Sequence, residues 1–164
     1  MASTSEEGLR RPDPYAVFRP RRGRGVAMVM AALSVLTFTI GAFSLPGLDP
    51  LFGGWGLLDR LVMVLSGLAI AGFLWRYAAI QATPSTGGLV IRNLFMTRRL
   101  EWTQIVRVQF GGGAPWVTLD LDDTDTVAVM AIQKADGAAG RADAARLSAL
   151  VQVHSGTPRP EAAP

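Results

Sequence analysis

The sequence predicts an α+β membrane protein in which a two-helix transmembrane hairpin precedes a small antiparallel β-domain that ends in a C-terminal helix. Three observations lead to this prediction. Two long apolar segments lie in the first half of the 164 residues. Short alternating runs separated by turn-forming residues occupy most of the second half, and a final segment with helical periodicity follows them.

The first transmembrane helix is predicted from residues 25–45, which contain no charge and nothing more polar than Ser or Thr. A helix rises about 1.5 Å per residue, so this segment covers about 31 Å, the thickness of the hydrocarbon core of a bilayer. A cleaved signal peptide is the alternative, but its apolar region is typically about 7–15 residues long. Here the run is longer and a second one follows, so we expect a span that stays in the protein.

A second span is predicted at about residues 60–80, after the helix-breaking sequence Pro46-Gly-Leu-Asp-Pro50. Only fifteen residues separate the two arginines that flank its apolar part, which is about 22 Å of helix, so both guanidinium groups must extend toward the headgroups. Gly67 and Gly72 are predicted to let the second helix approach the first closely. The transmembrane hairpin as a whole is expected at residues 25–80.

Positive charge is concentrated on one side of the two predicted spans. Six arginines precede the first span, one lies in the connecting loop, and four follow between residues 76 and 99. Segments rich in Arg and Lys stay in the cytoplasm, so both termini are expected to be cytoplasmic. Arg outnumbers Lys fifteen to one and Ala and Gly are abundant, which indicates a GC-rich bacterial genome, so the hairpin is expected to lie in the inner (cell) membrane. Residues 1–24, which are rich in Ser, Glu, Pro and Arg, are expected to form a disordered basic tail. The residues expected to set topology and interface position are Arg19, Arg21, Arg22, Arg24, Trp75, Arg76 and Tyr77.

Residues 81–153 are predicted to form the β-domain, whose strands are separated by clusters of Gly, Pro and Asp. The expected strands are Ala78 to Thr83, Gly88 to Leu94, Thr97 to Trp102, Ile105 to Phe110, Trp116 to Leu121 and Thr126 to Ile132. The fourth and fifth alternate between apolar and polar residues, which indicates one buried face. The residues expected on that face are Val106, Val108, Phe110, Val117, Leu119 and Leu121.

A helix is predicted from Ala138 to about Val153, because apolar residues recur there at spacings of three and four. One stripe of this kind is best explained as a lid over an open end or face of the sheet. The stripe consists of Ala144, Leu147, Leu150 and Val151. Residues 154–164, with three prolines, are expected to be disordered, and His154 is expected to be exposed to solvent near a frayed helix end.

Composition excludes several classes of chemistry. The chain has no Cys and one His, which removes disulfides, thiol nucleophiles, zinc–thiolate sites and a Ser-His-Asp triad. Four acids between Asp120 and Asp125 invite comparison with a calcium loop, but the Gly and the Glu that an EF-hand requires at its sixth and twelfth positions are missing. We interpret them as a solvated hairpin tip and predict no catalytic residue, metal ligand or cofactor.

The residues of the β-domain also resemble a known family. The similarity lies in Gly88-Leu-Val-Ile-Arg-Asn93, Arg99-Leu-Glu-Trp-Thr-Gln-Ile105, Val108-Gln-Phe110, Pro115-Trp116 and Val129-Met-Ala-Ile-Gln-Lys-Ala-Asp-Gly137. In this order they resemble the bacterial PH-domain family and, more narrowly, the actinobacterial membrane proteins called low-molecular-weight protein antigen 6. The resemblance implies a PH-like domain of six to seven strands capped by a C-terminal helix and preceded by two spans. It supplies no catalytic residues.

Two non-enzymatic functions follow as hypotheses. The first is a membrane-tethered interaction or regulatory module that binds a protein partner of unknown identity, with Trp116 and its large amphipathic ring as the candidate contact. The alternative is a sensor of anionic lipid headgroups, because Arg92, Arg98 and Arg99 offer guanidinium groups suited to phosphate. The expected partners are therefore membrane lipids and a protein, not a nucleic acid, and the sequence does not predict the oligomeric state.

Overall fold

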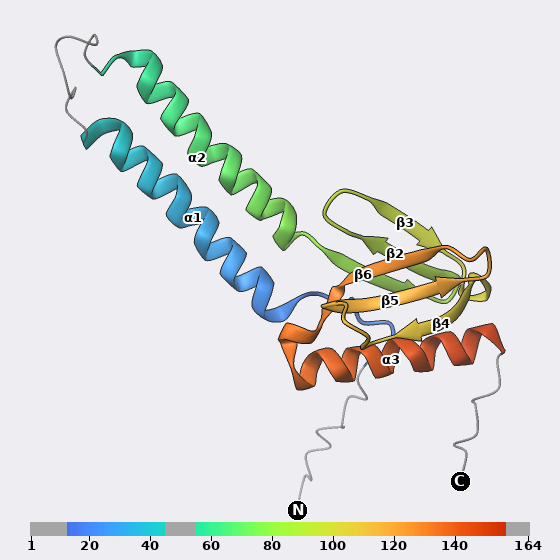
Figure 1. Ribbon diagram of the computed structural model, residues 1–164. Helices are drawn as coiled ribbons and strands as arrows, with labels where there is room; N and C mark the ends of the chain where they lie inside the picture. The colour runs from blue at the N-terminus through green and yellow to red at the C-terminus, as the bar shows by residue number, and fades with distance from the viewer. Residues whose placement is uncertain (1–12, 45–54, 157–164) are drawn as a thin grey trace, which may run out of the picture.

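A computed structural model describes residues 13–44 and 55–156 of the chain. Two long antiparallel helices lead into a domain built from two small sheets and a third helix (Figure 1). The helices are α1 (Arg21–Ser44), α2 (Leu57–Ala78) and α3 (Ala138–Ser155), and the 3-10 turns are η2 (Trp102–Gln104) and η3 (Lys134–Asp136). The strands are β1 (Gln81–Ser85), β2 (Gly88–Arg92), β3 (Thr97–Leu100), β4 (Ile105–Gln109), β5 (Trp116–Leu121) and β6 (Thr126–Gln133). The predicted order of helices, antiparallel strands and final helix is confirmed.

Helices α1 and α2 are both long and apolar enough to cross a membrane. Only 11% of the most apolar window of α1 and 6% of that of α2 are buried, unlike the core helices of a soluble domain. The two helices approach closely at Gly67, where a Cβ atom would lie 2.7 Å from the Cβ of Phe38. The Ser34 hydroxyl donates to the Gly67 carbonyl at 3.3 Å. A Cβ at Gly72 would meet no atom within 4 Å, so the predicted close approach holds for Gly67 alone.

Both helices begin where a carboxylate accepts hydrogen bonds from free backbone N–H groups. The Asp136 carboxylate accepts from the backbone N–H of Arg21 at 3.1 Å and from that of Arg22 at 2.9 Å. This cap extends α1 further toward the N-terminus than the apolar run alone predicts. The Asp59 carboxylate accepts from the backbone N–H of Gly56 at 2.9 Å, and α2 therefore begins before the apolar run as well.

The six strands form two three-stranded antiparallel sheets, ordered β1-β2-β3 and β4-β5-β6. The prediction of a first strand from Ala78 is wrong, because α2 continues through this residue and β1 begins at Gln81. Only two residues therefore separate the helix from the strand, which places the first sheet directly beside the end of α2. The alternation predicted for β5 is confirmed, since Val117, Leu119 and Leu121 are buried.

The prediction that Val106 faces the core is wrong. The register of β4 against β5 shifts between Ile105 and Arg107, as at a β-bulge. The irregularity turns Ile105 inward, where it is 2% exposed, and leaves Val106 64% exposed. Beyond it, Val108 packs partly buried against the core, as predicted.

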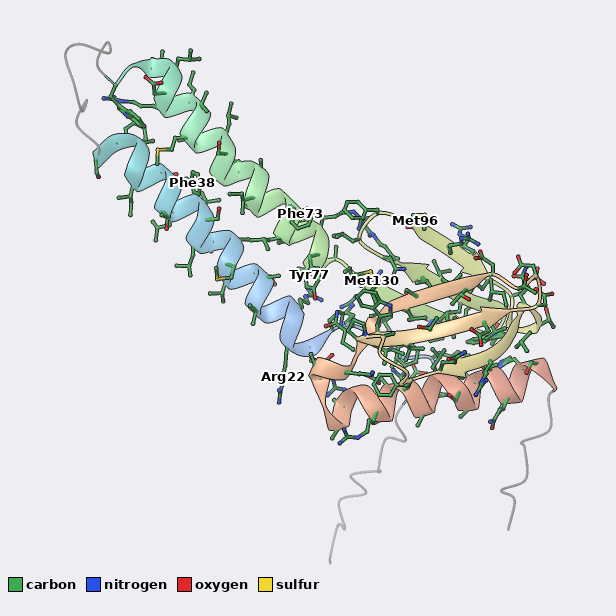
Figure 2. The ribbon with its side chains drawn as sticks, viewed as in Figure 1. Arg22, Phe38, Phe73, Tyr77, Met96 and Met130 are labelled. Atoms are coloured by element: carbon green, nitrogen blue, oxygen red, sulfur yellow. The ribbon has the colours of Figure 1, made fainter. Side chains whose placement is uncertain are left out.

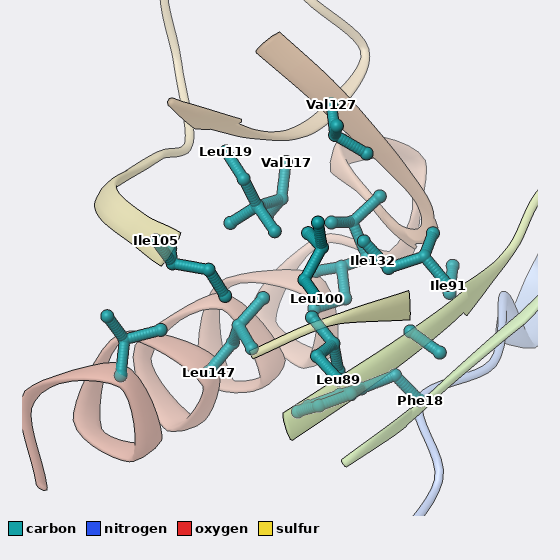
Figure 3. Packing of buried hydrophobic residues seen from close by; sticks show 14 of the residues in the cluster. Phe18, Leu89, Ile91, Leu100, Ile105, Val117, Leu119, Val127, Ile132 and Leu147 are labelled. Carbon is teal, nitrogen blue, oxygen red and sulfur yellow. The ribbon is translucent and has the colours of Figure 1, made fainter. Parts of the chain in front are cut away.

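Residues 13–20 form a strap across the domain, contrary to the predicted tail. Phe18 and Ala82 exchange backbone hydrogen bonds of 2.8 and 3.0 Å, which adds a β-bridge to the free edge of β1. The Phe18 ring is fully buried in the core (Figure 3). The Arg146 guanidinium lies 3.8 Å from the centre of that ring and donates to the Ala16 carbonyl at 2.8 Å. Composition did not reveal this strap because a single aromatic anchor lies in a polar segment, and the rest of the predicted tail, residues 1–12, lies outside the described residues.

Helix α3 closes the core formed by the two sheets. Figure 3 shows Leu147 of this helix directed toward Leu89 and Leu100 of the first sheet. The predicted apolar stripe of α3 is buried as expected. The helix extends to Ser155, slightly beyond the predicted end, and residues 157–164 of the predicted C-terminal tail lie outside the described part of the chain.

The prediction that His154 is exposed to solvent is wrong. Its imidazole stacks on the Trp102 ring, with centroids 5.1 Å apart. The His154 Nδ1 donates to the Leu150 carbonyl at 2.9 Å, and Nε2 forms a hydrogen bond of 3.0 Å with the Tyr15 hydroxyl. Trp102 is buried as predicted, and its indole donates to the Ser85 carbonyl at 2.9 Å. The last turn of α3 is thereby tied to the strap.

Candidate functional site

A basic pocket of about 150 Å³ lies where the two long helices meet the domain. We call it the junction pocket. Its lining residues are Arg19, Arg24, Met28, Trp75, Ala78, Ala79, Gln81 and Arg92. Three of them are arginines and none is an acid, so the field in the pocket favours an anion.

The strand register brings Arg92 to the junction pocket. Gln81, the first residue of β1, pairs with Arg92 across β1 and β2, so Arg92 lies at the end of the sheet that adjoins α2. Leu89 and Ile91 of the same strand are buried, so the alternation of the strand directs Arg92 to the outer face. The Arg19 Nε donates to the Gln81 side-chain oxygen at 3.2 Å, which positions a second guanidinium beside this pair.

The third arginine, Arg24, comes from the beginning of α1, whose position the domain controls. Beside the Asp136 cap described above, the Gln133 side chain donates to the Tyr77 hydroxyl at 3.2 Å. Both long helices are thus tied to the same short stretch of the domain, at the end of β6 and in η3. Figure 2 shows Arg22 and Tyr77 at the helix ends that meet the domain. The three arginines, which come from α1, the strap and β2, are therefore held in place by parts of the chain that are hydrogen-bonded to one another.

The junction pocket adjoins an apolar groove between α1 and α2, because Met28 and Trp75 line both. The groove has a volume of about 430 Å³. Its lining residues are Met28, Ala31, Ala32, Val35, Leu68, Ala71, Gly72 and Trp75. Trp75 is 65% exposed in the last turn of α2, a position that suits an indole at a membrane–water boundary. A basic pocket that continues into an apolar groove is complementary to the two parts of a phospholipid. The arginines suit its phosphate, and the groove suits an acyl chain.

The three arginines predicted as headgroup ligands do not line one pocket. Arg92 lines the junction pocket, whereas Arg98 forms an ion pair of 3.1 Å with Asp125. Arg99 lines a separate hollow, with Glu101, at the other end of the first sheet. The structure instead groups Arg92 with Arg19 and Arg24, which the sequence analysis had assigned to topology and interface position. Their place directly before the first apolar run was the one available signal.

Among the predicted interface anchors, Arg76 has an unusual environment. Its Nη1 atom is buried and has no hydrogen-bond partner among the described residues. A buried guanidinium nitrogen without an acceptor is unfavourable, so an oxygen of water or of a lipid phosphate would stabilise it there. Arg21 and Arg22 contribute their backbone N–H groups to the α1 cap, and both residues are exposed.

Trp116, the predicted partner contact, is half-buried at the beginning of β5. The register against β6 shifts directly after it, between Trp116 and Val117. The exposed Val106 lies near the opposite end of the β4–β5 pair, since Ile105 is opposite Leu121. The two residues therefore do not form a common apolar patch.

The aspartates of the β5–β6 turn are engaged with the backbone. Asp123 accepts from the N–H of Asp125 at 3.0 Å, and Asp125 accepts from the N–H of Thr126 at 2.9 Å. Within residues 13–44 and 55–156, no group of three or more His, Asp or Glu side chains could hold a metal ion. The geometry of a hairpin tip agrees with the interpretation from the sequence.

Residues 81–148 match the family model described as the bacterial PH domain. Similar curated proteins include an uncharacterized protein of Mycobacterium tuberculosis and one of Mycobacterium bovis. Each is 36% identical over 78 residues, which is 48% of this chain and 51% of the relative. In these matches the chain spans about half the length of the relatives. No solved structure matches the chain significantly. The resemblance to the bacterial PH-domain family, with actinobacterial relatives, is confirmed.

Proposed function

We propose that this chain, whose residues 81–148 are a bacterial PH domain, is an integral membrane protein that holds a non-catalytic PH-like domain against an anionic leaflet. The domain binds the phosphate of an anionic phospholipid in the junction pocket. One observation carries this proposal: Arg19, Arg24 and Arg92 line a single pocket that continues into the groove between the two long helices. The function is thus that of a lipid-responsive, membrane-anchored module.

The surface of the long helices supports the membrane part of the proposal. Phe43 is 66% exposed and Leu65 is 61% exposed, and large apolar side chains project in this way along both helices. Such a surface is unfavourable in water and favourable in hydrocarbon. Because the strap before α1 and the sheet after α2 share one core, both ends of the hairpin lie on the same side of the proposed membrane. The arginines at these ends favour the cytoplasmic side of the inner membrane.

The chemistry of the junction pocket explains how a lipid is selected. Guanidinium groups donate paired, charge-assisted hydrogen bonds to phosphate oxygens, and the partly apolar surroundings strengthen those bonds. The two spans keep the pocket at the leaflet, so even a weak site is filled at the high local concentration of lipid. Because the arginines come from the strap, α1 and β2, a bound phosphate stabilises the position of the domain relative to the helices. Recruitment of a protein partner stays a prediction.

Native mass spectrometry of lipids retained by the purified full-length protein tests this proposal. We expect the wild-type protein to retain phosphatidylglycerol in preference to phosphatidylcholine. Arg92→Ala should weaken phosphatidylglycerol binding about tenfold, the effect of losing a charge-assisted hydrogen bond of about 1.4 kcal/mol. Arg99→Ala is the matched control, because it removes an exposed arginine from the same sheet outside the junction pocket.

The outcomes separate a site from general attraction. Equal loss in the two variants would mean that net charge, and not the junction pocket, selects the lipid. The absence of any preference in the wild-type protein would contradict the selection of an anionic phospholipid. Glycerol phosphate added as a competitor distinguishes the two sources of phosphate, because a site shaped for an intact lipid keeps its lipid, whereas a site for a soluble phosphate exchanges it.

A further inference from the structure

The turn between β2 and β3, residues 93–96, exposes two adjacent large apolar side chains. Phe95 is 80% exposed and Met96 is 62% exposed. Single exposed apolar residues are ordinary on a protein surface, but two neighbours at the tip of a hairpin form a protruding apolar point. We call residues 93–96 the apolar tip.

The strand register places the apolar tip at the level of the helix ends. Gln81 pairs with Arg92, and only two residues separate the end of α2 from the beginning of β1. Because β2 runs antiparallel to β1, the chain beyond Arg92 continues past Gln81 in the direction of the last turn of α2. Figure 1 shows the loop between β2 and β3 pointing to the side of the domain where α2 ends, and Figure 2 shows Met96 on this hairpin.

Asn93 holds the apolar tip in one conformation. Its backbone N–H donates to the Met96 carbonyl at 2.9 Å and closes the turn. Its side-chain amide donates to the Ala128 carbonyl at 2.7 Å and accepts from the N–H of Met130 at 3.2 Å, which ties the tip to β6. The exposure of Phe95 and Met96 is therefore built into the domain and is not a consequence of a loose loop.

We propose that the apolar tip inserts into the interface of the same membrane that α1 and α2 cross. The domain itself then contacts lipid, in addition to the two helices. The aromatic ring of Phe95 and the thioether of Met96 suit the headgroup–hydrocarbon boundary. The inference rests on the proposal that α1 and α2 span the membrane, and it is independent of phosphate binding in the junction pocket.

Spin labels on single cysteines test the insertion, because the chain contains no Cys of its own. The full-length variants Phe95→Cys and Met96→Cys are labelled in nanodiscs with anionic lipid, and collisions with oxygen and with a water-soluble nickel complex are compared. Val106→Cys is the matched control, since Val106 is 64% exposed and β4 begins at the end of the domain remote from the helices. Leu65→Cys reports on α2 itself.

We expect oxygen collisions to exceed nickel collisions at residues 65, 95 and 96 and the reverse at residue 106. Labels at residues 95 and 96 that behave like the label at residue 106, while residue 65 remains in lipid, would overturn the insertion and leave the membrane spans intact. A label at residue 65 that is accessible to nickel would overturn both proposals. Because Phe95 and Met96 are exposed, their replacement leaves the core of the domain unchanged.

Discussion

Two of the hairpin tips of the PH-like domain carry opposite chemistry. The apolar tip between β2 and β3 exposes Phe95 and Met96 beside the end of α2. The tip between β5 and β6 consists of Asp122, Asp123, Thr124 and Asp125 and lies at the end of the domain remote from the helices (Figure 1). Apolar residues near the helices and acidic residues away from them are the distribution expected for a domain attached to an anionic leaflet.

The position of each tip follows from the way in which the domain is attached to the two long helices. Three connections orient the domain: the short link from α2 to β1, the strap that Phe18 anchors, and the Asp136 cap on α1. If the strap or the cap is lost, we expect the apolar tip to lose its fixed position and the acidic tip to be held less firmly away from the proposed leaflet. Changes at these connections therefore test the comparison more directly than changes at the tips.

The largest effect is expected for Phe18→Ala, which removes the anchor of the strap. Truncation of a fully buried Phe leaves a cavity and costs about 3–5 kcal/mol. We expect the free energy of unfolding of the domain in nanodiscs to fall by this amount. Intrinsic tryptophan fluorescence, to which the buried Trp102 contributes, follows the transition. The spin label at residue 96 should also become more accessible to the nickel complex, because the domain is held less firmly.

Val17→Ala is the matched control for the strap, because Val17 is 39% exposed and lies next to Phe18 in the chain. Its effect on unfolding should stay within about 0.5 kcal/mol. A loss within about 0.5 kcal/mol for Phe18→Ala as well would mean that the strap contributes little, and the orientation of the two tips would then depend on the other connections between the helices and the domain.

A smaller effect is expected for Asp136→Ala, which removes the cap of α1. The carboxylate accepts two backbone hydrogen bonds, and the loss of such a cap costs about 0.5–2 kcal/mol. Hydrogen exchange of the first turn of α1 should increase, with a smaller rise at β6. Asp122→Ala removes an exposed acid from the remote tip and serves as the control. Unchanged exchange at Arg21 and Arg22 would contradict a coupling of the domain to α1 through this carboxylate.

Much of the fold could be predicted because hydrophobic periodicity carries it. The apolar runs predicted both long helices, and the stripe that includes Leu147 predicted the buried face of α3. The errors occurred where one residue or one local irregularity outweighed the pattern. Phe18 turned a polar segment into a strap, and the register shift after Ile105 reversed the side on which Val106 lies. Neither effect has a compositional signal.

The candidate site was less accessible from the sequence. The junction pocket combines residues from the strap, α1, α2 and β2, and their proximity depends on the register of Gln81 against Arg92 and on the Asp136 cap. Periodicity reports which face a residue occupies, not which distant segment lies opposite that face. Arg92 was therefore identified as a candidate, but its neighbours Arg19 and Arg24 were assigned a separate role.

The smallest effect is expected for the ion pair that joins the first sheet to the acidic tip. Arg98 and Asp125 lie 3.1 Å apart with 47% of each side chain exposed, so solvent screens their attraction. We expect a double-mutant cycle of Arg98→Ala and Asp125→Ala to give a coupling energy of about 0.2–1 kcal/mol that decreases at high salt. The cycle is necessary because Asp125 also accepts a hydrogen bond from the N–H of Thr126, which the single variant loses as well.

Arg98→Ala should leave phosphatidylglycerol retention unchanged, because its charge is paired within the domain. A loss as large as that of Arg92→Ala would show that the overall charge of the arginine-rich sheet, and not the junction pocket, selects the lipid.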